Sequence, residues 1–398
     1  KLSVPVSMTE PRVRSAGAQK RRLPAKEDFA AMNVTYLDSA TMHPVSLQAK
    51  ARVESYLAAR ALIGEEPTGS RAATETRVLQ QFARLINADA DEVCFVPNTT
   101  TAEHSVVRSL GLTEPGGRLV TDTLHFFGSF YLYHELGKLG VDIVWLQPKE
   151  GRIELSEVRA ALTKKTRLVV LSLVSSINGF QPNLKEVCAI AHAIGAYVYA
   201  DIAHAAGCVP IDVKDSEVDF AAGPSFKWLM GDFGLGFLYV RREALQALQR
   251  VQFGYQQLAS WRTVDFPIRP PAVSLQGYRP RADATGYFAT GTLPHSVIAQ
   301  LDWSLEYILG LGVNEIQDYR QPMLKRLKAE LPRLGYPLLT PEESLAPLVV
   351  CDCRDAKELE QHLLAQKIKI AFHQNRLRVS PSVFNDMADV DRLLDALN

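Results

Sequence analysis

The feature that most constrains the fold is a pair of charged residues at the ends of two predicted strands. A short apolar run at 197–200, YVYA, ends on Asp201, and a second run at 218–222 leads into the loop that carries Lys227. A third strand is predicted from Gly236 to Val240. One strand ends on an acidic residue, and the loop after the next strand carries a lysine. This arrangement places a carboxylate and an amine at the same edge of a sheet.

This pairing is what a pyridoxal 5'-phosphate site requires. The lysine supplies the amine for a Schiff base, and the carboxylate keeps the pyridine nitrogen protonated. Burial and neighbouring positive charge would lower the pKa of the lysine for that task. Taken singly, Asp201 could be the N-cap of a helix starting near Ile202, and Lys227 a solvated loop lysine. The pairing, with glycines and aromatic residues around the lysine, favours the cofactor site.

Composition excludes several other classes of protein. The 398 residues are 47% hydrophobic and carry no net charge, so they can bury a large core but create no field for nucleic acid or an anionic membrane. No apolar run is long enough to span a bilayer. The five cysteines show neither a disulfide framework nor zinc spacing. We therefore expect a cytoplasmic protein that binds neither nucleic acid nor membrane.

From about residue 93 to residue 200, predicted strands and helices alternate. This rhythm predicts an α/β fold with a mostly parallel sheet covered on both faces, and ligands in such sheets bind at the carboxyl ends of the strands. The glycine loop at 231–236 precedes a strand, so it does not match a dinucleotide fingerprint. Polar residues follow four strand ends: Thr99 with Thr100, His125, Ser175 with Ser176, and Asp201.

The threonines Thr99 and Thr100 stand where a strand gives way to a helix. Free backbone N–H groups, the helix dipole and the hydroxyl donors make such a junction a ready anion site. An ordinary N-cap cluster is the alternative.

The chain divides into three predicted regions. Residues 1–35 form an N-terminal arm, residues 36–292 the large cofactor-binding domain, and residues 293–398 a linking helix with a small α+β domain. The linking helix is predicted from His295 to Leu311. Prolines and arginines at 264–281 predict a long irregular excursion, and such loops often form active-site walls.

The chain resembles fold-type I pyridoxal phosphate enzymes of the class V aminotransferase group, which includes cysteine desulfurases, isopenicillin N epimerases and C–S lyases. The resemblance covers nearly everything from Tyr36 onward. It rests on FVPNTTTAEH at 95–104, ADIAHAAG at 200–207, SFKWLMGDFGLGFLYV at 225–240, ATGT at 289–292 and LRVSPSVFN at 377–385. It implies a large domain with a seven-stranded type of sheet, a smaller C-terminal domain, and a homodimer with shared active sites.

The resemblance also implies a role for each cofactor-binding residue. Lys227 corresponds to the Schiff-base lysine and Asp201 to the partner of the pyridine nitrogen. His204 corresponds to a residue that hydrogen-bonds the cofactor's phenolic oxygen. Thr99 and Thr100 correspond to the pair that binds the phosphate, with Ser225 as an additional donor. His125 corresponds to the residue that stacks on the cofactor ring.

Three further residues are implied to bind the substrate or to complete the dimer. Arg378 corresponds to the arginine that clamps the substrate's α-carboxylate, a task that suits a bidentate guanidinium; a structural ion pair is the alternative. Ser176 falls where desulfurases have an asparagine near the substrate. Thr292 corresponds to a threonine that reaches the phosphate of the neighbouring subunit's cofactor.

One departure from the family bears on the reaction. Cysteine desulfurases carry a nucleophilic cysteine on a loop shortly before the arginine run, but residues 368–376 here read IKIAFHQNR, without a cysteine. We therefore expect an L-α-amino acid to react through an external aldimine in a C–S β-elimination that uses no catalytic cysteine. An epimerase of the isopenicillin N type and an aminotransferase are the alternatives. The complete set of site residues argues against a non-enzymatic module on this fold.

Overall fold

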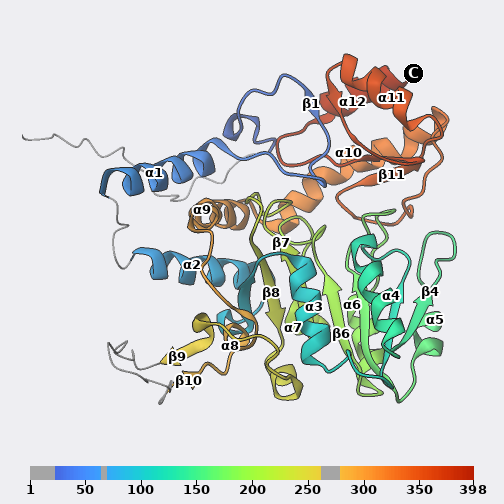
Figure 1. Ribbon diagram of the computed structural model, residues 1–398. Coiled ribbons are helices and arrows are strands. Elements are labelled where there is room, and N and C mark those ends of the chain that lie inside the picture. Colours follow the sequence, from blue (N-terminus) through green and yellow to red (C-terminus); the bar gives the residue numbers. More distant parts are fainter. Residues whose placement is uncertain (1–22, 64–69, 261–277) are drawn as a thin grey trace, which may run out of the picture.

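The computed structural model describes residues 23–63, 70–260 and 278–398. Figure 1 shows a large sheet flanked by helices, with the C-terminal region, orange to red, on one side of it. Most of the predicted arm and residues 264–277 of the predicted excursion lie outside the described residues. Across the described ranges, none of the helices combines the length and the apolar character that crossing a bilayer requires.

The central sheet has seven strands in the order β2-β8-β7-β6-β5-β3-β4. Only β8 runs against its neighbours, because it pairs antiparallel with both β2 and β7 while the other pairs are parallel. The prediction of a mostly parallel α/β sheet is confirmed. The strands are β2 (Val93–Val96), β3 (Arg118–Asp122), β4 (Asp142–Leu146), β5 (Thr166–Ser172), β6 (Tyr197–Asp201), β7 (Phe220–Pro224) and β8 (Gly236–Val240).

Each strand contributes to two separate cores, because successive side chains point to opposite faces of the sheet. In β5, Val169 and Leu171 join one core, whereas Leu168 and Val170 join the other. Helices cover both faces, which explains why these strands are nearly continuous apolar runs. The first core is covered by α2, α5, α6 and α9, and the second by α3, α4 and α8.

The helices of the large region follow the strands in the alternation that the sequence predicts. The linking helix α9 has the predicted bounds and packs against both α1 and α2 (Figure 1). The helices are α1 (Leu47–Ile63), α2 (Ser70–Leu85), α3 (Thr99–Ser109), α4 (Phe130–Lys138), α5 (Leu155–Ala161), α6 (Leu184–His192), α7 (Val213–Ser216), α8 (Ala284–Phe288) and α9 (His295–Leu311). Strand β9 (Leu258–Ser260) pairs antiparallel with β10 (Arg279–Pro280).

The C-terminal region builds its own core around a three-stranded antiparallel sheet of order β11-β14-β13. Its elements are α10 (Val313–Arg333), β11 (Val349–Asp352), α11 (Ala356–Ala365), β12 (Ile368–Lys369), β13 (Ala371–His373), β14 (Arg376–Val379) and α12 (Met387–Leu397). The N-terminal strand β1 (Thr35–Tyr36) pairs with β12, and Leu37 is buried in this core. The chain thus enters the large region from the side of the small one, and the predicted domain boundaries stay predictions.

Two local expectations differ from the structure. The strand before the lysine loop begins at Phe220 rather than Val218. Just before it, the Asp219 side chain accepts a hydrogen bond from the backbone N–H of Val198 at 2.8 Å. No helix starts after Asp201, since the residues that follow form turns. Asp201 is therefore not a helix N-cap.

Candidate active site

Strand direction brings the predicted site residues to one edge of the sheet. Because β8 is antiparallel to both of its neighbours, β2 is parallel to β7, and the carboxyl ends of β2, β3, β5, β6 and β7 meet at that edge. The segments that leave these ends carry Thr99, His125, Ser176, Asp201 and Lys227. The sequence prediction that these strand ends form one site agrees with this arrangement.

The lysine loop is held by backbone hydrogen bonds and by α9. Ser225 N donates to Leu235 O at 3.0 Å, and Gly231 N donates to Ser225 O at 2.8 Å. Met230 adopts a left-handed φ of 57°, which is uncommon for a residue other than glycine. Its carbonyl accepts hydrogen bonds from Gln300 Nε2 at 2.9 Å and Ser304 Oγ at 3.0 Å. The helix therefore fixes a strained loop and, through it, the position of Lys227.

Lys227 and His204 are in direct contact. The Nζ atom of Lys227 lies 3.1 Å from His204 Nε2. Burial, opposed by the charge of Asp201 and aided by the charge of Arg378, lowers the pKa of Lys227 to about 8. Burial, Lys227 and Arg378 also hold the pKa of His204 well below its usual value. The imidazole is therefore neutral, and the amine is much closer to its reactive neutral form than a solvated lysine.

His204 lies on a turn that packs against the lysine loop. Gly207, in the same turn, has φ of +90°, and a Cβ there would stand 2.7 Å from the carbonyl oxygen of Trp228. Only glycine permits this close approach. The predicted motif at 200–207 thus places His204 and Asp201 beside Lys227 through backbone packing.

Asp201 is buried at the end of β6, and its Oδ1 accepts a hydrogen bond from Ala203 N at 2.8 Å. Burial raises the pKa of this carboxyl, while the charges of His125 and Lys227 and the hydrogen bond from Ala203 act against the rise. The carboxylate is therefore ionised only with the help of nearby positive charge.

Arg378 lies on β14 and is 4% exposed, yet it has few partners. Its Nη2 donates to Thr41 Oγ1 at 2.6 Å and lies 3.7 Å from Asp38 Oδ1. Its Nε has no hydrogen-bond partner among the residues that the structure describes. A buried guanidinium with an open donor suits a carboxylate ligand. The contact with Asp38 also keeps the predicted alternative of a structural ion pair open.

The predicted phosphate residues differ in how free they are. Thr99 and Thr100 form the first turn of α3, whose N-cap Asn98 accepts from Thr101 N at 2.8 Å. The earlier N–H groups of the helix remain available to an anion. Ser225, in contrast, is fully buried and donates its hydroxyl to the carbonyl of Asp232. Its predicted role at the phosphate stays a prediction.

Two predicted residues lie at the margin of the site. Thr292 is exposed, and its Oγ1 lies 3.1 Å from the hydroxyl of Tyr255. Ser176 is half-buried in the loop after β5. Their predicted roles, across a subunit interface and near the substrate, remain predictions.

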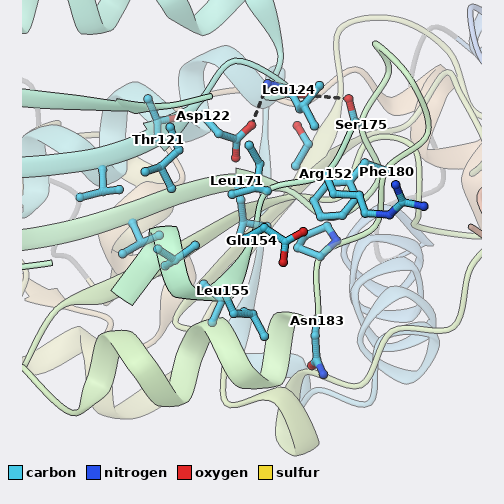
Figure 2. A pocket seen from close by; sticks show the side chains of 18 of the residues that line it. Thr121, Asp122, Leu124, Arg152, Glu154, Leu155, Leu171, Ser175, Phe180 and Asn183 are labelled. Carbon is cyan, nitrogen blue, oxygen red and sulfur yellow. Dashed lines mark hydrogen bonds between the residues drawn. The ribbon is translucent and has the colours of Figure 1, made fainter. Parts of the chain in front are cut away.

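His125 is fully buried, with its Nδ1 3.0 Å from Ser172 Oγ. Figure 2 shows how the turn before it is fixed: Asp122 Oδ1 accepts from Leu124 N at 2.8 Å, and Ser175 Oγ donates to Leu124 O at 2.7 Å. Asp122, Leu124, Ser172 and Ser175 line a cavity of about 390 Å³, and its lining contains none of His125, Lys227 and Arg378. The cavity is therefore separate from the lysine site.

Sequence reasoning missed three polar residues near the site. Asp38 and Thr41 lie in a segment that precedes a helix, and only their contact with Arg378 gives them a role. Glu103 is 4% exposed and lies 3.5 Å from His125. Its position could have been noticed, because it lies three residues before Val106 and four before Val107, on the apolar face of α3.

The residues present fit pyridoxal phosphate. The amine of Lys227 has a lowered pKa, and Asp201 is a buried carboxylate at the end of the adjacent strand. A neutral His204 that accepts from Lys227 at Nε2 carries its proton on Nδ1, and Nδ1 has no hydrogen-bond partner in the described part of the chain. This orphaned donor suits the phenolic oxygen that the family places there.

Comparisons with known proteins support the same interpretation. A probable cysteine desulfurase from Methanothermobacter thermautotrophicus is 28% identical over 299 residues, which cover 74% of this chain and 71% of the relative. A cysteine desulfurase from Yersinia pseudotuberculosis is 28% identical over 340 residues, covering 80% of each chain.

Solved structures share the fold. The apo cysteine desulfurase from Thermococcus onnurineus NA1 superposes with a TM-score of 0.82 at 23% identity, over 95% of this chain and 98% of the other. The cystine C-S lyase C-DES, solved with cysteine persulfide, gives a TM-score of 0.82 at 19% identity, over 92% and 97%. A variant of C-DES carries glycine linked covalently to its pyridoxal phosphate cofactor.

The family model of aminotransferase class-V matches residues 35–393, nearly the whole described chain. This match confirms the fold-type I prediction and the predicted cofactor class, pyridoxal phosphate. The chain belongs to the class V aminotransferase family.

Proposed function

We propose that this protein is a pyridoxal phosphate-dependent lyase that cleaves the Cβ–S bond of an L-cysteine derivative without a cysteine of its own. The proposal depends on one observation above all. All five cysteines of the chain are buried, none more than 3% exposed: Cys94, Cys188, Cys208, Cys351 and Cys353.

Burial makes these thiols poor nucleophiles. It raises the pKa of Cys208 to about 12 and likewise that of Cys351 to about 12. The thiolate is the nucleophile, so a thiol of this kind is inert at neutral pH. The cysteine desulfurase relatives share the family, but a reaction that transfers sulfur to an enzyme thiol needs an accessible one. A sulfur leaving group that departs as a free thiol needs none.

The bound cofactor would withdraw electrons from the substrate's Cα. Lys227 would hold the cofactor and then, once released as an amine with a pKa near 8, take the Cα proton. Arg378 would bind the α-carboxylate through its open Nε and its Nη atoms. Asp201 would hold the proton of the cofactor's pyridine nitrogen. The first turn of α3 would bind the cofactor's phosphate.

The net reaction is redox-neutral. Cα loses a proton, the Cβ–S bond breaks with its electron pair leaving on sulfur, and sulfur takes up a proton as the thiol. Water then hydrolyses the released enamine to pyruvate and ammonia. Epimerisation would instead require a second acid on the opposite side of the substrate, and transamination a second keto acid.

The test is an S-substituted L-cysteine in deuterated water, with pyruvate, free thiol and substrate configuration measured together. Stoichiometric pyruvate and thiol are expected. Recovery of the D-substrate with deuterium at Cα, without pyruvate, would establish an epimerase. A reaction that requires a keto acid to accept the amino group would establish an aminotransferase.

Alkylation of the native enzyme with iodoacetamide is the matched control for the thiol. Because all five cysteines are buried, the folded protein should resist modification and keep its activity. Rapid loss of activity with one alkylated cysteine would refute the thiol-independent mechanism.

A further inference from the structure

A buried ionic network lies beside Asp201, and the predicted cofactor contacts do not explain it. Glu103 on α3 is 4% exposed and His125 is fully buried. His125 Nε2 lies 3.5 Å from Glu103 Oε1, and Nδ1 lies 3.0 Å from Ser172 Oγ. Nδ1 thus contacts Ser172, whereas Nε2 lies within ion-pair distance of Glu103 but makes no hydrogen bond among the residues that the structure describes.

The partners of Glu103 favour its ionised form. The Ser129 hydroxyl donates to Oε2 at 2.5 Å, and the Tyr133 hydroxyl donates to Oε1. Burial alone would raise the pKa of this carboxyl, but His125 and the two hydroxyls hold it below its usual value. A buried carboxylate with two hydroxyl donors and a cationic neighbour is well stabilised.

Strand register brings this network to Asp201. Ser172, which contacts the His125 ring, is paired with Asp201 in the register of the parallel strands β5 and β6. Such neighbours lie about 4.8 Å apart. Leu173 N also donates to Asp201 O at 2.9 Å, which fixes the two strand ends together. The His125 ring therefore contacts the residue that is paired with Asp201 on the neighbouring strand.

The charges around His125 come from three elements. Glu103 faces it from α3, Asp201 from β6 and Asp122 from β3. Burial favours the neutral ring, but these three carboxylates together raise the pKa of His125 above its usual value. Tyr199 and Tyr133 also face the network, and burial keeps both phenols neutral by raising their pKa values.

We propose that Glu103 holds His125 as an imidazolium beside Asp201, so that Asp201 stays ionised where it holds the proton of the cofactor's pyridine nitrogen. The proposal rests on the proposed function only in placing Asp201 against that nitrogen. His125 is then a positioning residue that acts through Asp201, and its predicted ring-stacking role stays a prediction. Glu103 supplies the negative charge that a buried imidazolium requires.

The experiment uses the holoenzyme with histidine labelled with carbon-13 at Cε1. NMR titration reports the protonation of each ring, and His125→Asn identifies the His125 signal by its loss. We expect a protonated ring from pH 6 to 8 in the native protein. Glu103→Gln keeps the shape but removes the charge, and it should make the ring neutral in that range. A neutral His125 in the native holoenzyme at pH 7 would overturn the proposal.

Cofactor affinity gives a second readout. Glu103→Gln should weaken cofactor binding about tenfold, because a neutral His125 would no longer favour the ionised form of Asp201. Tyr133→Phe keeps both charges and is the matched control, so it should change affinity less. If Glu103 acts through His125, adding Glu103→Gln to His125→Asn should cost no further affinity. An equal tenfold loss in that background would contradict the proposal.

These readouts require the cofactor but no turnover. A protein inactive on every cysteine derivative would refute the lyase assignment and leave the protonation of His125 still decided by NMR. If Glu103→Gln fails to fold, the titration of native His125 decides the matter alone.

Discussion

Replacing Lys227 by methionine should stabilise the apoprotein, because the native fold buries this amine at a cost. Burial lowers the pKa of Lys227 from 10.5 to about 8. A tenfold change in an acidity constant is about 1.4 kcal/mol, so the charged form is disfavoured by at most about 3.5 kcal/mol in the folded state. The residue keeps partial solvent exposure, which reduces the expected gain to about 2 kcal/mol.

The pH dependence follows from the sign of the shift. Between pH 8 and 10.5 the unfolded chain binds more protons at Lys227 than the folded protein does, so native stability rises with pH in that window. The advantage of Lys227→Met should therefore be full below about pH 8 and vanish near pH 10.5.

Urea unfolding of the apoproteins, at fixed protein concentration and at pH 7 and 10.5, measures this difference. Lys138→Met is the matched control, because Lys138 is exposed and Glu135 raises its pKa. That variant should show no gain. A Lys227→Met variant no more stable than the native apoprotein at pH 7, or one whose advantage persists at pH 10.5, would refute the reasoning.

Three other changes test the remaining parts of the site. Lys227→Ala should lose the borohydride-reducible attachment of the cofactor, whereas Asp201→Ala should retain some cofactor but lose nearly all turnover; a fully active Asp201→Ala would remove that residue from the mechanism. Arg378→Lys should raise KM for the amino acid about 10- to 100-fold, because one or two charge-assisted hydrogen bonds are lost, and it should change kcat less. An unchanged KM would favour the structural ion pair with Asp38. Sedimentation should show a homodimer at assay concentration, and a fully active monomer would contradict a site shared through Thr292.

Much of the fold could be predicted because hydrophobic patterning and strand-end chemistry agree. Lys227 and Asp201 are found at adjacent strand ends because β6 and β7 are parallel neighbours. The start of β7 differs from the prediction where the side chain of Asp219 accepts a hydrogen bond from Val198 N, a contact that strand propensity does not indicate. The alternative of a helix after Asp201 is wrong, because Gly207 lies in a turn that packs against Trp228 and the local sequence pattern does not indicate this turn.

The partners of Arg378 and His125 were beyond the sequence for a different reason. Asp38 reaches Arg378 across 340 residues of chain, and Glu103 meets His125 only because α3 packs over the turn after β3. Such pairs depend on tertiary contacts between elements whose own patterns are ordinary. A glutamate on an apolar helix face is the one local sign, since a buried carboxylate demands a partner.

Burial acts on both cations of the site and gives opposite results. Lys227 and Arg378 each have a pKa lowered by burial, and the charge of Arg378 also acts to lower the pKa of Lys227. Lysine can respond by losing its proton, so it becomes the reactive amine. Arginine cannot lose its proton at any working pH, so Arg378 stays a cation whose Nε has no hydrogen-bond partner in the described part of the chain and is proposed to bind a carboxylate. In the proposed mechanism, burial would therefore give a reactive amine in the loop after β7 and a carboxylate site on β14, and exchanging the two residue types should abolish both functions.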